Sequence, residues 1–247
     1  MEILKPKLVE RPWGGSRLAS WCGGDTDTTG ETEKRGAIGE AWVHEGNEPP
    51  RVLLKWIDAR EILSVQNHPS DPGYSKNEAW YFLEAPREGR IVTGIKGGID
   101  DEAVPERLLW TDVKKGDFLF VPAGCVHALT PGSFVLEIQQ PLNVTYRIYD
   151  WGRGRPLQIE EAARAFRAGP PSLRRCPLEP GRHILTDRRE FRVECVNGPV
   201  VLSWRRPYLA AVVKGPKEGV TLLCESDEEM EVRKGERVIL VTDGEDE

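Results

Sequence analysis

The chain has 247 residues, enough for one large or two small domains, and its 39% hydrophobic and 30% charged residues are typical of a soluble globular protein. Its 34 basic residues are outnumbered by 40 acidic ones, and the net charge of −6 argues against a nucleic-acid partner, because nucleic-acid-binding surfaces are basic. No apolar run approaches the roughly 18–20 residues that span a bilayer, and the N-terminus lacks the apolar core of a signal peptide. Five scattered cysteines are typical of a reducing compartment, so we expect a cytoplasmic protein without a membrane partner.

Short apolar runs, separated by many of the 25 glycines and 19 prolines, predict a sandwich or barrel of short strands. In chain order, strands are predicted at residues 52–57, 78–83, 118–121, 134–139, 144–151, 200–204, 209–213, 220–224 and 237–241. Two helices are predicted, the first at residues 101–110. The second, at residues 158–168, is followed by Gly169 as a C-terminal stop.

The best internal boundary follows that second helix, where Gly169 precedes two prolines. It divides the chain into residues 1–169 and a smaller β region at residues 170–247. The segments KGDFLFV at residues 115–121 and KGERVIL at residues 234–240 look like one element used twice. We therefore expect an all-β fold with two related barrels, of which only the first is equipped for chemistry.

Three local signals in the first region carry polar groups that suit a metal. The spacing Gly116-x5-Pro122-x-Gly124-x-x-His127 predicts a tight turn that directs an imidazole into a barrel mouth. In the run LSVQNHP at residues 63–69, the side chains of Ser64, Gln66 and His68 share one face of an extended strand. By the same rule, Lys76 and Glu78 share a face in the run KNEAWY at residues 76–81.

Together the three signals offer two imidazoles, one carboxylate and one amide oxygen from three separate strands. Such nitrogen and oxygen ligands suit zinc, while iron, manganese and cobalt are chemically possible substitutes. His44 and His183 have no such setting, and we expect both to be structural.

These motifs resemble a known family. The Gly116-to-His127 spacing resembles the second signature motif of cupins, which are jelly-roll β-barrels. The chain is similar more narrowly to the type I mannose-6-phosphate isomerases (phosphomannose isomerases), in a compact form of bacterial or archaeal type. The similar segments, in the family's order, are residues 11–15 (RPWGG), 53–60, 63–69, 76–81, 122–129, 137–140 and 145–151.

The resemblance implies a cupin barrel followed by a smaller, degenerate cupin-like barrel and a few short helices. It implies one zinc ion per chain, and it places the zinc ligands at Gln66, His68, Glu78 and His127. The C-terminal barrel has no matching ligand set, so it is expected to hold no metal.

The same resemblance implies the other site residues. It places Lys76, Arg147 and Glu137 among the catalytic groups, with Glu137 as our candidate base; a structural carboxylate paired with Arg147 is the alternative interpretation. It places Ser64 and Arg153 at the substrate phosphate and Trp13 beside the pocket. Because residues 147, 149, 151 and 153 alternate, an extended segment would direct both arginines to one side.

The implied function is the zinc-dependent interconversion of mannose 6-phosphate and fructose 6-phosphate through a cis-enediol, with a sugar phosphate as the only implied partner. Zinc would serve either as a Lewis acid or by orienting the open-chain sugar. Three alternatives remain: a cupin-type glucose-6-phosphate isomerase, whose motif is His-x-His where this chain has Gln66; an iron dioxygenase; and a non-catalytic sugar-binding cupin. The sequence does not indicate an oligomeric state.

Overall fold

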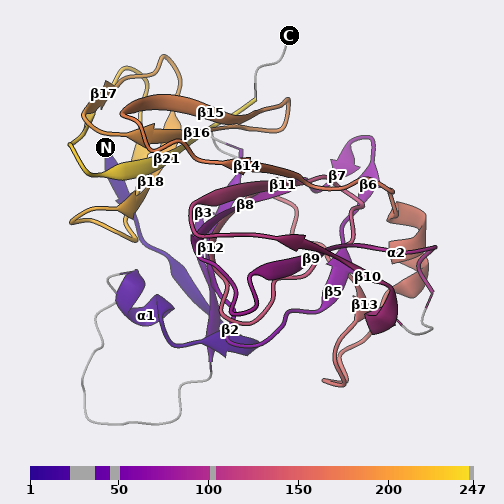
Figure 1. Cartoon of the computed structure of the whole chain (residues 1–247). Coiled ribbons are helices and arrows are strands. Elements are labelled where there is room, and N and C mark those ends of the chain that lie inside the picture. The colour runs from indigo at the N-terminus through magenta and orange to yellow at the C-terminus, as the bar shows by residue number, and fades with distance from the viewer. Residues whose placement is uncertain (23–36, 45–50, 101–103, 245–247) are drawn as a thin grey trace.

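The computed structural model describes residues 1–22, 37–44, 51–100 and 104–244, and the fold is almost entirely β (Figure 1). The larger of the two main sheets has seven strands, all paired antiparallel. In spatial order they are β14 (Ser172–Arg175), β11 (Asp117–Val121), β8 (Glu78–Glu84), β12 (Phe134–Gln139), β4 (Leu53–Asp58), β3 (Ile38–His44) and β2 (Lys7–Gly15). The central strands β4, β8 and β12 have both faces covered, which explains why each has a nearly continuous apolar sequence.

A shorter wall faces this sheet and closes the first barrel. It consists of β5 (Val65–Asn67) paired with β13 (Tyr146–Tyr149) and of β9 (Arg90–Ile95) paired with β10 (Leu108–Asp112). The loop after β11 joins the two pairs, because His127 bridges to Gln66 and Ala128 bridges to Val92. The first barrel therefore carries Gln66 and His127 on adjacent backbone segments.

The second sheet lies on the outer face of the first, in orange and yellow at the upper left of Figure 1. Its six strands, in spatial order, are β1 (Glu2–Leu4), β19 (Thr221–Cys224), β18 (Tyr208–Lys214), β21 (Arg237–Thr242), β16 (Arg192–Asn197) and β15 (Gly181–Asp187). One apolar core, which includes Trp56, Leu136 and Ile239, fills the space between the two sheets. A separate core, which includes Trp80, Leu119 and Val135, fills the first barrel.

The remaining elements are short. They are α1 (Leu18–Trp21), α2 (Ile159–Ala165), the 3-10 turn η1 (Val104–Arg107), and the strand pairs β6 (Ser70–Asp71) with β7 (Tyr74–Ser75) and β17 (Val200–Leu202) with β20 (Met230–Val232). None of the helices that the structure describes is long and apolar enough to cross a membrane.

All nine predicted strands are present, and the predicted helix at residues 158–168 is confirmed as the shorter α2. The helix predicted at residues 101–110 is wrong. Residues 101–103 lie outside the described part, residues 104–107 form the single turn η1, and Leu108 begins a strand that pairs with β9. In this strand the backbone hydrogen bonds that a helix would form locally are made across the sheet instead.

The division into residues 1–169 and 170–247 stays a prediction, and two strands pair across it. β14 completes the edge of the first sheet beside β11, although it follows residue 169. At the other end, β1 pairs with β19 of the second sheet. The N-terminal strand thereby ties the two halves of the chain together.

Candidate metal and substrate site

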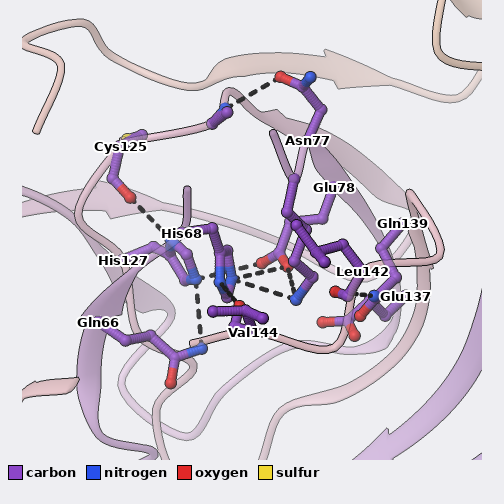
Figure 2. A network of polar contacts seen from close by, with 12 residues as sticks. Gln66, His68, Asn77, Glu78, Cys125, His127, Glu137, Gln139, Leu142 and Val144 are labelled. Atoms are coloured by element: carbon purple, nitrogen blue, oxygen red, sulfur yellow. Dashed lines mark hydrogen bonds and ion pairs between the residues drawn. The ribbon is translucent and has the colours of Figure 1, made fainter. Parts of the chain in front are cut away.

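The centre of the site is a group of three buried side chains, those of His68, Glu78 and His127 (Figure 2). The Nε2 atom of His68 lies 3.0 Å from Oε2 of Glu78, and Nε2 of His127 lies 3.2 Å from Oε1 of the same carboxylate. Each residue is at most 1% exposed. His68 follows β5, Glu78 begins β8, and His127 lies in the loop after β11, so the group joins both walls of the barrel.

The turn before His127 depends on Gly124. This glycine has φ of +79°, and a Cβ atom there would lie 2.2 Å from the carbonyl oxygen of Ala165 at the end of α2. The following amide, that of Cys125, donates to the carbonyl of Pro122 at 3.1 Å and closes the turn. The sequence Pro-x-Gly-x-x-His thus aims an imidazole into the barrel, as predicted.

Both imidazoles are oriented by the ring nitrogen that faces away from Glu78. Nδ1 of His68 lies 2.8 Å from the carbonyl oxygen of Val144, and Nδ1 of His127 lies 2.9 Å from that of Cys125. Carbonyl oxygens only accept, so each Nδ1 carries the proton and each Nε2 presents a lone pair to the site.

The charges of the three groups follow from burial and from one another. Burial, with the nearby ammonium of Lys76, lowers the pKa of His68 to about 3, and burial lowers the pKa of His127 as well. Burial alone would raise the pKa of Glu78, but the ammonium of Lys76 holds that pKa well below its ordinary value. The site therefore holds a carboxylate and two neutral imidazoles at neutral pH.

Gln66 supplies a fourth polar group beside His127. Its backbone exchanges hydrogen bonds of 3.1 Å and 2.9 Å with that of His127, and its Nε2 lies 3.4 Å from Nε2 of His127. Its Oε1 accepts a hydrogen bond from Ser64 Oγ at 3.0 Å. Rotating the amide by half a turn exchanges the two atoms, so that Oε1 faces the imidazole and Nε2 donates to Ser64.

These four residues fit a metal ion. The carboxylate of Glu78 is buried without a hydrogen bond of normal geometry, and it faces the lone pairs of two imidazoles, an arrangement that is repulsive without a cation. Ligands at about 2.0–2.1 Å from a tetrahedral zinc ion lie about 3.3 Å from one another. The separations of 3.0, 3.2 and 3.4 Å agree with that value.

Lys76 lies against the same group. Its Nζ is 2.9 Å from Oε2 of Glu78 and 3.2 Å from Nε2 of His68. Burial lowers the pKa of Lys76, but Glu78 and Glu137 outweigh burial, and the net pKa is raised. Lys76 thus stays charged beside the carboxylate of Glu78.

Glu137 lies on β12, opposite Lys55 of β4 and Trp80 of β8. Its Oε1 is 3.3 Å from Nζ of Lys55, and its Oε2 accepts a hydrogen bond from Trp80 Nε1 at 3.1 Å. Lys55 also donates to Gln139 at 2.8 Å. The ionic partner of Glu137 among the described residues is therefore Lys55 and not Arg147, the partner in the alternative interpretation.

A cavity of about 400 Å³ lies beside this group, because Gln66 and Lys76, which contact the group, form part of the cavity wall. Its walls include Trp13, Ser64, Gln66, Lys76, Glu137 and Arg147 from the predicted set, and Arg11, Lys55 and Arg155 in addition. Trp13 is 3% exposed, so only its edge forms part of the wall. A cavity of this size suits a small molecule.

Arg153 does not line this cavity. The expected alternation from residue 147 to 153 is wrong, because β13 ends at Tyr149 and the chain turns at Trp151, where φ is +54°. Arg153 instead donates to the carbonyl of Ile62 at 2.8 Å and that of Asp150 at 3.0 Å. Arg155 occupies the cavity wall, where its Nε donates to Asp150 Oδ2 at 2.9 Å.

Sequence reasoning did not assign Arg11, Lys55 or Arg155 to the site. Lys55 gives a usable signal, because it is the single charged residue in the apolar run at residues 52–57, where a charge must find a buried partner. Arg155 gives none, because it lies two residues beyond Arg153 in a Gly-rich turn whose path the sequence does not determine. His183, predicted to be structural, is half-buried and contacts the carbonyl of Glu179 at 2.9 Å.

Comparison with known proteins gives a consistent result, although no family model matches the chain. Mannose-6-phosphate isomerase ManA of Bacillus subtilis is 32% identical over 61% of this chain, and the chain spans only 61% of ManA. Mannose-6-phosphate isomerase of Streptococcus mutans is 29% identical over 96% of this chain and 91% of its own length.

Solved structures agree on the fold. A crystal structure of mannose 6-phosphate isomerase bound with zinc and yttrium superposes with a TM-score of 0.69 over 99% of this chain and 100% of the other, at 12% identity. The all-β cupin fold implied by the sequence motifs is thereby confirmed. These matches, one of which covers almost the full chain, show that the chain is similar to the mannose-6-phosphate isomerases.

Proposed function

We propose that this chain is a zinc-dependent aldose–ketose isomerase that interconverts mannose 6-phosphate and fructose 6-phosphate. The observation that carries the proposal is that the His68–Glu78–His127 group contacts Lys76, which lines a small cavity together with Glu137. Metal ligands, a buried cation and a carboxylate around one small cavity are the groups that enediol chemistry needs. The names of the relatives support the choice of substrate.

One zinc ion per chain would be held by His68, Glu78, His127 and the amide oxygen of Gln66. When bound, it supplies a positive charge that polarises or orients the oxygens of the open-chain sugar. We propose a single ion because the described residues contain one group of this kind.

Glu137 is proposed to move the proton between C1 and C2 of the sugar. Isomerisation through a cis-enediol requires one base that removes a proton from one carbon and returns it to the other. Glu137 suits this role because its carboxylate lies in the cavity wall and is fixed by Lys55 and Trp80. The Lys76 ammonium, charged and buried beside Glu78, would stabilise negative charge that develops on the sugar oxygens.

The phosphate is proposed to bind among Ser64, Arg147 and Arg155. The two guanidinium groups line the cavity and suit a dianion, and Ser64 adds a hydroxyl donor. Arg155 replaces Arg153 in this role, because Arg155 lines the cavity and Arg153 does not. We also propose the cytoplasm as the compartment, since all five cysteines are free.

The test is isomerisation of mannose 6-phosphate in D₂O, followed by NMR of the product, with glucose 6-phosphate and unphosphorylated mannose assayed in parallel. The proposal predicts fructose 6-phosphate that carries solvent deuterium at C1, because the proton passes through a base in contact with solvent. Turnover of glucose 6-phosphate, without turnover of mannose 6-phosphate, would make the chain a cupin-type glucose-6-phosphate isomerase. Binding of sugar phosphates without turnover would make it a sugar-binding cupin.

A further inference from the structure

A second and larger cavity, of about 760 Å³, lies away from the metal group. Its walls come from α1, the C-terminal part of β8, the turn before β11, the end of β14 and the strands β18 and β21 of the second sheet. It therefore lies where the first barrel meets the second sheet. We refer to it as the inter-sheet cavity, and its volume is within the range of small-molecule sites.

The inter-sheet cavity is on the opposite face of the sheet from the proposed active site. On β8, Tyr81 and Leu83 line it, whereas Trp80 and Phe82 belong to the core of the first barrel. Trp80 is the residue that donates to Glu137. Side chains alternate along a strand, so the sheet itself separates the two cavities.

The charge of the inter-sheet cavity is strongly positive. Its lining includes six basic side chains, those of Arg17, Lys114, Lys115, Arg175, Lys214 and Arg237, against the two carboxylates of Glu84 and Glu218. Three of the six have acidic partners, which are Asp58 for Arg17, Glu84 for Lys115 and Asp117 for Arg175. The other three form no ion pair with any residue that the structure describes.

Arg237 is the most informative of these three cations. It is only partly exposed, and its guanidinium donates to neutral oxygens, those of Asn197 Oδ1 at 2.7 Å, Tyr81 Oη at 3.1 Å and the Pro177 carbonyl at 3.2 Å. A cation that is withdrawn from water without a counter-charge is costly. The exposed side chains of Lys114 and Lys214 add to this charge at the rim. The cavity is thus complementary to an anion.

The rest of the lining suits a planar apolar group. Trp21, Tyr81 and Phe134 contribute aromatic surface, and the rings of Trp21 and Phe134 meet edge to face at 4.9 Å. The indole Nε1 of Trp21 is buried without a hydrogen-bond partner in the described chain. A buried donor of this kind is expected to find an acceptor, which a ligand can supply.

We propose that the inter-sheet cavity binds a small organic phosphate with a planar ring, of the size of a nucleoside monophosphate. The cations Arg237, Lys114 and Lys214 would hold the phosphate, because guanidinium and ammonium groups are strong donors to phosphate oxygens. The aromatic side chains would pack on the ring. This proposal concerns binding alone, and it stands whether or not the chain isomerises sugar phosphates.

The test is titration calorimetry of the full chain with adenosine monophosphate and, separately, with inorganic phosphate. The double variant Lys114→Glu/Lys214→Glu reverses two charges at the rim without touching Arg237, whose removal disturbs packing. Lys217→Glu makes the same charge change at an exposed residue outside the cavity and serves as its control. Arg155→Ala reports binding in the other cavity.

We expect adenosine monophosphate to bind wild type, Lys217→Glu and Arg155→Ala with equal affinity, and to bind the double variant at least tenfold more weakly. We expect inorganic phosphate to bind at least tenfold more weakly than the nucleotide. No saturable binding of the nucleotide would overturn the proposal, as would loss of binding in Arg155→Ala with the double variant unaffected. Equal affinity for the two probes would overturn the role of the planar ring.

Discussion

Acid should destabilise the metal-free protein through His68, because this side chain is 1% exposed and its pKa is about 3. In the unfolded chain a histidine has a pKa of about 6.5. The folded-state pKa is the lower one, so the unfolded state binds its proton first. The stability that neutral His68 contributes is therefore complete above about pH 6.5 and is lost as the pH falls toward 3.

The size of the effect follows from these two pKa values. At pH 5 an unfolded histidine with a pKa of about 6.5 gains about 2 kcal/mol by protonation, and folded His68 gains almost none. His127, whose pKa is also lowered, acts in the same direction. Glu78 contributes in another window, because its depressed pKa gives stability that is lost only below about pH 4.5. Measurements between pH 8 and pH 5 therefore exclude the contribution of Glu78.

The assay is urea unfolding of the chelator-treated protein at pH 8 and pH 5, for wild type and His68→Gln. The loss of unfolding free energy between the two pH values should be smaller by about 2 kcal/mol in the variant. His183→Gln, at a half-buried site outside the metal group, should lose as much as wild type. An equal loss in wild type and His68→Gln would refute the reasoning, because it would mean that His68 keeps an ordinary pKa in the folded protein.

Four further predictions concern single substitutions. Glu137→Gln should keep zinc, measured by elemental analysis, but lower kcat by about 10²–10⁴, the usual contribution of a positioned base; a near-normal kcat would move the base elsewhere, to Lys76 first. Lys55→Met should lower the free energy of unfolding by about 3–5 kcal/mol, since it leaves Glu137 buried without its cation. Lys55→Arg should recover part of this loss. An unchanged urea midpoint in Lys55→Met would contradict the ion pair. Arg155→Ala should raise KM with little change in kcat. Arg153→Ala should mainly lower the free energy of unfolding, by about 1–3 kcal/mol, in the same urea assay. The reverse pattern would indicate that Arg153, and not Arg155, contacts the phosphate. Gly124→Ala should lower the free energy of unfolding by more than about 1–2 kcal/mol, because φ is positive and the Cβ would meet Ala165. The variant should also bind zinc more weakly in a competition assay. An unchanged zinc affinity would show that the turn does not position His127.

The grouping of the candidate metal ligands was predictable from sequence because each of them lies in a strong local pattern. Period-two alternation places Gln66 and His68 together, and Gly124 determines the turn before His127. The long apolar strands were predictable for the same reason, since burial on both faces leaves a continuous signal. The order of the motifs indicated the resemblance to mannose-6-phosphate isomerases, and the comparisons find the chain similar to members of that family.

Features that depend on distant partners were not predictable. The three residues of β1 carry no pattern that assigns them to β19 of the second sheet. Leu108–Asp112 was mistaken for helix because its partner β9, which decides the structure, lies 13 or more residues away in sequence. Arg155 was missed because the turn at Trp151 breaks the alternation that linked Arg147 to Arg153. In each case tertiary contacts outweighed local sequence.

Paired measurement of metal content and isomerase activity shows whether the candidate ligands hold a zinc ion that the reaction requires. We expect about one zinc per chain in wild type, loss of fructose 6-phosphate formation after chelation, and its return when Zn²⁺ is added. His68→Ala should lose metal and activity together, and His183→Ala should keep both. Full activity on mannose 6-phosphate in a demonstrably metal-free sample, or in His68→Ala, would contradict the account.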